Sequence, residues 1–169
     1  RNISQHLRDA GHRVTTIGPL EPQVTMWARI KFRFYRHVLG LVYLINRDPT
    51  VSRCRALNAM RLLGQLEDVD AVIVVALSDA AFLDVTQPII LVHDATWRQL
   101  LDFYPGYERN KLAKETLEGA EEMELLSLKK CGAAIYASKW AARSAVEHYG
   151  LIPTKVTTLP FGAGLNPTP

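Results

Sequence analysis

The chain has 169 residues, 48% hydrophobic and 22% charged, a composition that fits one ordinary globular domain and excludes a disordered chain. A formal net charge of +3 is too small to indicate nucleic acid as a partner. Cys54 and Cys131 lie far apart and belong to no Cys or His cluster, which excludes a disulfide scaffold and a zinc ribbon. Two free cysteines also favour a cytoplasmic protein.

The first part of the chain shows helical and strand periodicity in turn. Apolar residues at 3, 7 and 10 share one helical face, and Gly11 is typical of the residue that ends a helix. The β-branched residues 14–17 predict a strand. Residues 27–46 lack proline and predict one long helix, which Asp48-Pro49 breaks before a second helix runs from Ser52 to about residue 66.

The rest of the chain alternates short apolar runs with helical stretches. Apolar strands are predicted at residues 71–76, 88–92, 132–137 and 155–159, and helices at 96–103, 108–130 and 138–149. Strands that are apolar on consecutive residues are expected to be buried on both faces. With helices between them, they predict an α/β fold with a doubly wound, Rossmann-like parallel sheet.

Such a domain normally begins with a strand, whereas this chain begins with a helical pattern. We therefore expect the first strand and its turn to precede Arg1 in a longer protein. Residues 1–161 form one predicted domain. Residues 162–169, rich in glycine and proline, are expected to start a linker.

Ligands of open parallel sheets bind at the carboxyl ends of the strands, so the loops after the four strands hold the candidate site. His93 and Asp94 follow the second apolar strand, where they could act as acid, base or hydrogen-bonding clamp. Asp94 could equally cap the following helix. Ser138 could bind a ligand or only cap its helix, and Gly162 begins a Gly-Ala-Gly segment that fits a flexible connection better than a dinucleotide fingerprint.

Basic and aromatic residues alternate near the start of the predicted long helix. Residues 27–37 hold four cations, four aromatic rings and no acid. This mixture suits the headgroups of an anionic membrane, and a cationic solvated face, a partner surface or a polyanion groove would explain it equally well. The residues proposed for peripheral contact with a membrane, at its inner face, or with a partner are Trp27, Arg29, Lys31, Arg33 and Arg36.

Four segments together resemble the N-terminal domain of GT-B glycosyltransferases, and most closely the retaining family 4. LRDAGHRV at residues 7–14 resembles the entry to the second strand of that fold, and IILVHD at 89–94 resembles a strand that ends in a polar pair. AIYASKW at 134–140, followed by AVEHYGL at 145–151, resembles a strand, a serine-capped helix and a Tyr-Gly turn. KVTTLPFG at 155–162 resembles the strand that closes the domain, although Gly164 stands where the family is commonly acidic.

The resemblance implies a two-domain enzyme that transfers a sugar from a nucleotide-sugar donor to an acceptor hydroxyl without a metal or another cofactor. This domain would hold the acceptor, a saccharide or a lipid-linked one, and a C-terminal domain would hold the nucleotide sugar. His93 matches the family histidine that projects into the cleft near the transferred sugar. Asp94 would orient the loop or the acceptor hydroxyl, and Ser138 and Gly162 would line the cleft.

Two other classes of protein could share this α/β pattern. A non-catalytic Rossmann-like binding or interaction domain would share the fold without the chemistry. A dehydrogenase that uses NAD is disfavoured because no GxGxxG lies between a strand and a helix. If the chain is half of a transferase, we expect it to be inactive alone, because the other half of the transition-state site would be missing.

Overall fold

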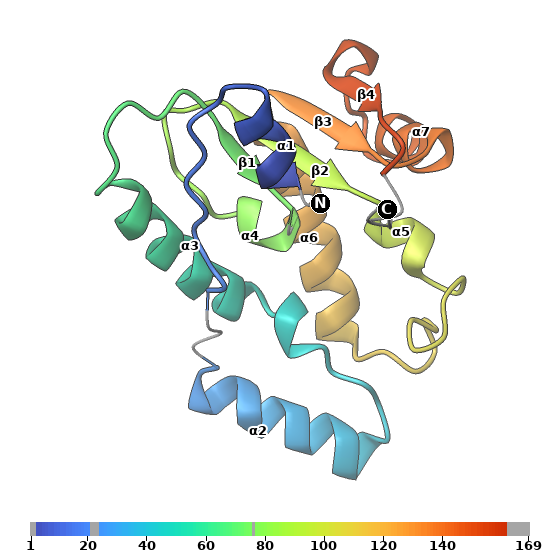
Figure 1. The fold of residues 1–169 in the computed structure, drawn as a ribbon. Coiled ribbons are helices and arrows are strands. Elements are labelled where there is room, and N and C mark those ends of the chain that lie inside the picture. The colour runs from blue at the N-terminus through green and yellow to red at the C-terminus, as the bar shows by residue number, and fades with distance from the viewer. Residues whose placement is uncertain (1–2, 21–23, 76, 162–169) are drawn as a thin grey trace, which may run out of the picture.

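The computed structural model describes residues 3–20, 24–75 and 77–161. In this part of the chain, a mixed α/β fold is built on a four-stranded parallel sheet (Figure 1). Its strands, in spatial as well as chain order, are β1 (Val72–Val74), β2 (Ile89–His93), β3 (Ala133–Tyr136) and β4 (Val156–Thr158). The prediction of an α/β fold with a parallel sheet is confirmed, and the sheet is consistent with a Rossmann-like fold. The four described strands follow one another across the sheet in chain order, so the described residues do not contain the reversal of strand order that defines a doubly wound sheet. Gly162 and the expected linker lie outside the described residues.

The sheet is held by one row of apolar side chains that crosses all four strands. Val74 pairs with Leu91, Leu91 with Ala134, and Ala134 with Val156. Leu91 and Ala134 are buried in the main core, and Val74 and Val156 pack against it. The expectation that every strand is buried on both faces is wrong at the edges, where Ile73 of β1 is 41% exposed. An edge strand has a neighbour on one side only, so fewer side chains cover it.

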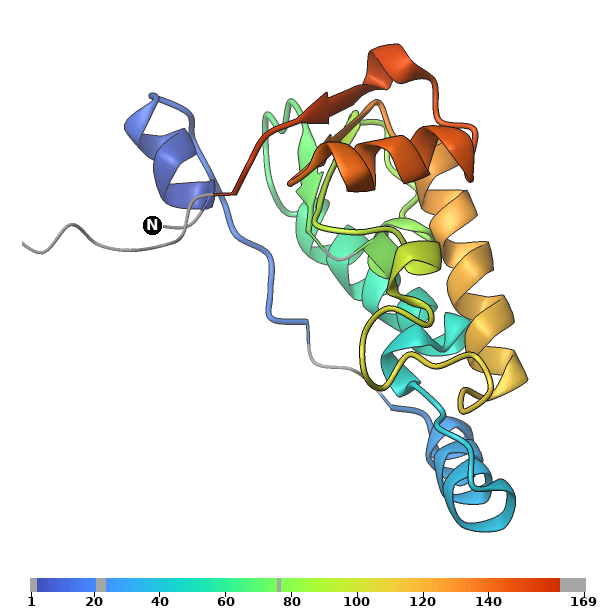
Figure 2. The same cartoon turned by 90° about the vertical axis from the view of Figure 1, so that its right-hand side faces the viewer.

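The helices cover the sheet unequally. Helix α4 packs against β1, β2 and α6, whereas α7 packs against β3 and β4. Helix α1 has no buried residue, and Figure 2 shows it set apart from the sheet. The helices are α1 (Ile3–Asp9), α2 (Met26–Phe34), α3 (Pro49–Leu63), α4 (Leu77–Ala80), α5 (Trp97–Leu100), α6 (Lys114–Lys130) and α7 (Lys139–Glu147), with a π-turn, η1 (Tyr35–Leu39), and 3-10 turns η2 (Ile45–Arg47) and η3 (Pro153–Lys155).

The strand predicted at residues 14–17 is not formed. Residues 12–20 have no regular secondary structure, and Thr15 and Thr16 are exposed. A strand needs a neighbour that accepts and donates its backbone hydrogen bonds, and the segment has none among the described residues. Its contact with the body is made instead by Arg13, whose guanidinium donates to the carbonyl oxygen of Glu67 at 3.2 Å.

The single helix predicted over residues 27–46 is divided into three parts. Helix α2 passes into the π-turn η1, which ends at Gly40 in the left-handed conformation with φ 65°. An extended stretch follows, in which Val42 pairs with Leu112, and then comes η2. The absence of proline did not reveal this break, because a glycine with positive φ ends the helix.

Asp48 and Pro49 begin helix α3 rather than only ending the preceding segment. The Asp48 carboxylate caps the helix by accepting from the backbone N–H of Thr50 at 2.6 Å, and proline fits the first helical position. Asp48 is buried and also accepts a hydrogen bond from the Tyr43 hydroxyl. Helix α6 packs closely on this start, since a Cβ at Gly119 would lie 3.0 Å from the Pro49 ring.

The two helices that follow β2 are shorter than expected. The stretch predicted at 96–103 forms only α5, and the helix predicted from residue 108 begins at Lys114. Turns that include Gly106, with φ 89°, occupy the residues between them. Tyr107 and Leu112 of these turns belong to a second small core with Trp97.

We predict that Asp48→Ala lowers the free energy of unfolding by about 2 to 4 kcal/mol, since it removes a helix cap and leaves the buried Tyr43 hydroxyl without its acceptor. Burial opposes ionisation of Asp48, but hydrogen bonds from Tyr43, Thr50 and Val51 outweigh it and lower its pKa. The ionised Asp48 carboxylate therefore contributes stability above its unfolded-state pKa, and this contribution is lost as the pH falls through the lowered pKa of the folded state. Urea denaturation at pH 7 and pH 3 should show a smaller difference between wild type and variant at pH 3. An Asp48→Asn variant, which keeps an acceptor, should lose less; equal losses in both variants would contradict the account.

Candidate functional site

His93, Asp94 and Ser138 lie at the same edge of the sheet. His93 is the last residue of β2 and pairs with Tyr136, the last residue of β3, two positions before Ser138. Because the strands are parallel, their carboxyl ends meet at this edge. The sequence-predicted residues of the β2 and β3 loops are thus brought to adjacent strand ends.

The His93 imidazole is fixed by a hydrogen bond to its own loop. Its Nδ1 lies 2.6 Å from the carbonyl oxygen of Ala95 and 3.2 Å from a carboxylate oxygen of Asp94. A carbonyl oxygen can only accept a hydrogen bond, so Nδ1 carries the proton and Nδ1–H donates a hydrogen bond to the Ala95 carbonyl. In the neutral ring, Nε2 then presents a lone pair that can accept a hydrogen bond from a ligand hydroxyl.

The surroundings of His93 favour its neutral form. Burial lowers the pKa of the imidazole, and the positive charge of Arg47 lowers it further. The Asp94 carboxylate and the Ala95 carbonyl act in the opposite direction but do not reverse the shift. With a side chain that is 15% exposed, His93 is a nearly buried acceptor at a strand end.

Asp94 points into solvent and does not cap the next helix. Its side chain is 76% exposed, and Thr96 occupies the N-cap position of α5. The interpretation of Asp94 as a simple helix cap is therefore wrong, because the loop runs two residues further before the helix begins. The carboxylate is left available to a ligand while it remains beside His93.

The loop after β2 and the helix α5 that follows it are tied to α7 by two hydrogen bonds. The Thr96 hydroxyl lies 2.6 Å from that of Ser144, and the Gln99 amide nitrogen donates to the carbonyl of Trp140 at 2.8 Å. Ser138 caps α7 by accepting from the backbone N–H of Ala141 at 3.2 Å. The capping interpretation of Ser138 is thus confirmed, and it does not prevent the residue from lining a site.

Arg47 is a charged residue near this site that sequence reasoning missed. Its guanidinium lies 5.2 Å from the centre of the Trp97 ring. Its positive charge adds to the lowering of the His93 pKa and opposes the raising of the Asp79 and Glu124 pKa by burial. Within the described residues no salt bridge engages this guanidinium. The only available signal was its position directly before the Asp48-Pro49 helix start.

A second charged pair lies beyond the end of β1. Arg55 of α3 and Asp79 of α4 are joined by a salt bridge of 2.9 Å, and both side chains are largely buried. Burial raises the pKa of Asp79, although Arg55 and Arg47 oppose the shift. The pair ties α4 to α3 beyond the carboxyl end of β1.

Three exposed aromatic rings gather where α5 ends and α7 begins. The Phe103 ring lies 5.4 Å from that of Trp140 and 4.9 Å from that of Tyr104, measured between ring centres. All three side chains are exposed. Trp140 lies in the first turn of α7 and belongs to the AIYASKW segment that the sequence singled out, whereas Phe103 was expected inside a helix and gave no signal.

The basic and aromatic residues of α2 lie away from the sheet. Trp27, Arg29, Arg33 and Arg36 are exposed, as a contact surface requires. Lys31 differs, because its ammonium forms a salt bridge with Glu115 of α6. The α2 residues are therefore not part of the site at the strand ends.

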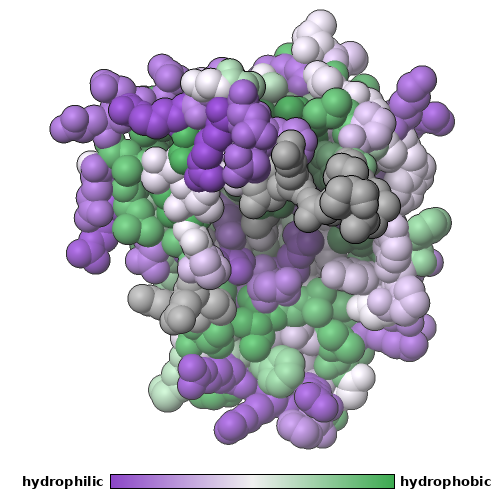
Figure 3. Space-filling model, in the orientation of Figure 1, coloured by the Kyte–Doolittle hydropathy of each residue, from purple (hydrophilic) through white to green (hydrophobic). Residues whose placement is uncertain are grey.

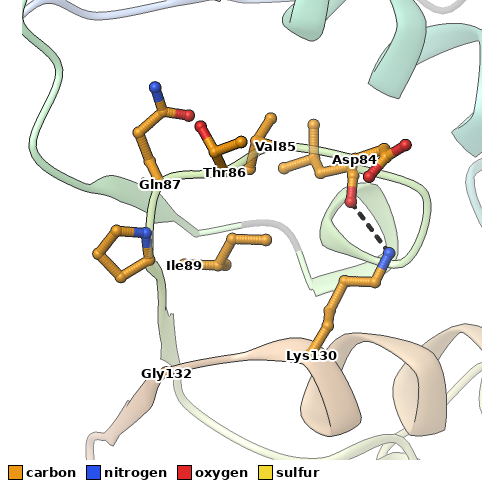
Figure 4. Close-up of a pocket in the computed structure, with 9 residues that line it drawn as sticks. Asp84, Val85, Thr86, Gln87, Ile89, Lys130 and Gly132 are labelled. Carbon is orange, nitrogen blue, oxygen red and sulfur yellow. Dashed lines mark hydrogen bonds between the residues drawn. The ribbon is translucent and has the colours of Figure 1, made fainter.

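The hollow drawn in Figure 4 lies at the opposite edge of the sheet. It has a volume of about 330 Å³ and is lined by residues 83–89 with Lys130 and Gly132, near the amino end of β2. The Lys130 ammonium donates to the backbone carbonyls of Ala81 and Leu83 at 2.8 and 3.0 Å. Since these bonds occupy the ammonium, we assign the pocket no ligand.

The described residues contain neither a candidate metal site nor a helix that could span a membrane. Residues 3–20, 24–75 and 77–161 contain no group of three His, Cys, Asp or Glu side chains placed to hold a metal ion. Within the same ranges, no helix combines the length and the apolar character needed to cross a membrane.

No family model, curated protein or solved structure matches the chain.

We predict that Glu124→Gln stabilises the protein more at pH 8 than at pH 5. Burial raises the pKa of Glu124 to about 7, and its Oε1 has no hydrogen-bond partner among the described residues. Because the pKa of Glu124 is raised in the folded state, the protonated carboxyl contributes stability at low pH, and this contribution is lost as the pH rises through about 7. Denaturant unfolding at the two pH values measures the effect. The same stability difference at both would show that Glu124 titrates normally.

Proposed function

We propose that the chain is the acceptor-binding N-terminal domain of a retaining GT-B glycosyltransferase of the family 4 type. The observation that carries the proposal is the His93 imidazole at the end of a central strand, with its neutral form favoured, Nδ1 bound to the Ala95 carbonyl, and Nε2 without a hydrogen-bond partner among the described residues. The order of the four motifs along the sequence supports the same conclusion. The parallel sheet is compatible with it, since ligands of such sheets bind at the carboxyl ends of the strands.

In this proposal His93 contacts the substrates through Nε2. A neutral imidazole accepts a hydrogen bond from a hydroxyl of the transferred sugar or of the acceptor and thereby fixes its direction. Its ring cannot rotate freely, because Nδ1–H is bound to the Ala95 carbonyl. The energetic benefit is preorganisation, since the group is already oriented when the substrate arrives.

Asp94 orients the acceptor hydroxyl from the solvent side of His93. Its exposed carboxylate can accept a hydrogen bond from that hydroxyl, which raises the electron density on the attacking oxygen. The nucleotide sugar is bound by a C-terminal domain, and its departing phosphate takes the acceptor proton. Ser138 lines the cleft, and no metal participates.

Phe103 and Trp140 form a stacking face for a saccharide acceptor. The two rings are exposed and adjacent, and Trp140 is joined through its carbonyl to Gln99 of α5. The C–H faces of a pyranose pack well on aromatic rings, which cover apolar area without losing many rotamers. This face lies beside the loops that follow β2 and β3, where an acceptor would approach His93.

We predict that His93→Ala in the full two-domain protein lowers kcat by about 100-fold or more, as expected for removal of one preorganised hydrogen-bonding group. Transfer and hydrolysis of a panel of nucleotide sugars measure the activity. His12→Ala, which removes an exposed histidine from residues 12–20, is the matched control and should leave kcat unchanged. A full-length protein that neither binds nor cleaves any nucleotide sugar would overturn the proposal in favour of a non-catalytic binding domain.

We predict that Trp140→Ala raises the KM for the acceptor by about 10-fold while kcat changes little, because loss of a stacking face weakens ground-state and transition-state binding alike. Leu57→Ala, on the exposed side of α3, serves as the control for loss of an exposed apolar side chain. A fall in kcat at unchanged KM would contradict a stacking role.

A further inference from the structure

Helix α2 and the π-turn that follows it expose an unbroken apolar stripe. Met26, Ile30, Phe34 and Val38 recur at every fourth residue, so they lie on one side of the helix. Met26 is 77% exposed and Val38 67%, and Trp27, at 66%, lies beside the stripe. Single exposed apolar residues are ordinary, but five adjacent ones mark a contact surface.

The opposite side of α2 is fixed to the body of the protein. Ala28 is buried, and Lys31 and Tyr35 both bind the carboxylate of Glu115 on α6. The ring of Tyr35 also stacks on that of Tyr43, with centres 5.4 Å apart. The helix cannot turn its apolar stripe inward without breaking these contacts, so the stripe faces outward in the folded protein.

Arginines lie directly beside the stripe. Arg29, Arg33 and Arg36 are spaced by four and three residues, so they share the neighbouring side of the helix, and all three are exposed. No acidic residue occurs between Met26 and Leu39. Figure 3 shows hydrophobic and strongly hydrophilic side chains next to each other over α2.

We propose that this surface binds the anionic face of a lipid bilayer, with α2 lying in the plane of the interface. The apolar stripe would enter the boundary between headgroups and acyl chains, and the three arginines would contact lipid phosphates. Charge complementarity favours a bilayer as the occupant, because a continuous anionic surface neutralises a row of arginines wherever the helix lies. Lys31, which the sequence included in the contact, is excluded by its salt bridge to Glu115. The proposal does not depend on the transferase function.

Co-sedimentation with vesicles tests the proposal on the intact chain. Wild type should bind vesicles of phosphatidylcholine and phosphatidylserine, and high salt or the use of phosphatidylcholine alone should weaken binding. Arg29→Gln/Arg33→Gln/Arg36→Gln should lower the partition coefficient by roughly 100-fold, since each arginine near an anionic surface contributes about fivefold. The control, Arg61→Gln/Lys129→Gln/Arg143→Gln, removes the same charge from exposed positions on α3, α6 and α7 and should bind as wild type does.

A second variant tests the stripe itself. Ile30→Ser/Phe34→Ser should abolish binding while leaving the unfolding transition in place, because both side chains are already exposed. Acyl chains that carry bromine should quench the emission of Trp27, and Trp27→Phe should remove that quenching. Equal binding by the two arginine variants, or no binding by wild type, would overturn the proposal. A dimer that the serine variant dissolves would also overturn it, by showing that the stripe contacts a second copy.

Discussion

The parallel register between β2 and β3 is the constraint on which the candidate site depends. It sets His93 opposite Tyr136, so the loops that begin at Asp94 and Ala137 leave the sheet side by side. A shift of one residue would turn the imidazole to the other face of the sheet and bury different side chains. The apolar row through Leu91 and Ala134 prevents that shift, because it would place core residues on the exposed face. Packing in the core therefore determines the geometry at the strand ends.

Helix α6 connects the site to the α2 surface. Glu115 in its first turn holds Lys31 and Tyr35, and so fixes which side of α2 faces outward. Two turns later, Glu121 binds both Arg98 of α5 and the Tyr149 hydroxyl, and Glu124 lies buried within the field of Arg47. One long helix thus supports the loop of His93 and the proposed membrane surface, which places the two at a fixed separation in the folded protein.

The sequence predicted the central elements well and the peripheral ones poorly, for a physical reason. Strands β2 and β3 are apolar on consecutive residues, and their pattern survives because both are covered by neighbours. The residues at 14–17 have the same β-branched character, but a strand depends on a partner that its own sequence does not specify. In the site, His93 and Ser138 could be found from their places after the strands. Arg47 and Phe103 could not, because tertiary contacts bring them there from turns without a local signal.

The tautomer of His93 is the most direct test of the central claim, that a buried neutral imidazole presents Nε2 at the end of β2. Long-range proton–nitrogen NMR of the chain labelled with nitrogen-15 histidine reports it, and His93→Gln assigns the signal. We predict the Nδ1–H tautomer at pH 7, with a pKa lower than the ordinary value of 6.5, because burial and Arg47 disfavour the charged ring. An Nε2–H tautomer, or an imidazolium at pH 7, would contradict the account by leaving no free acceptor at the site.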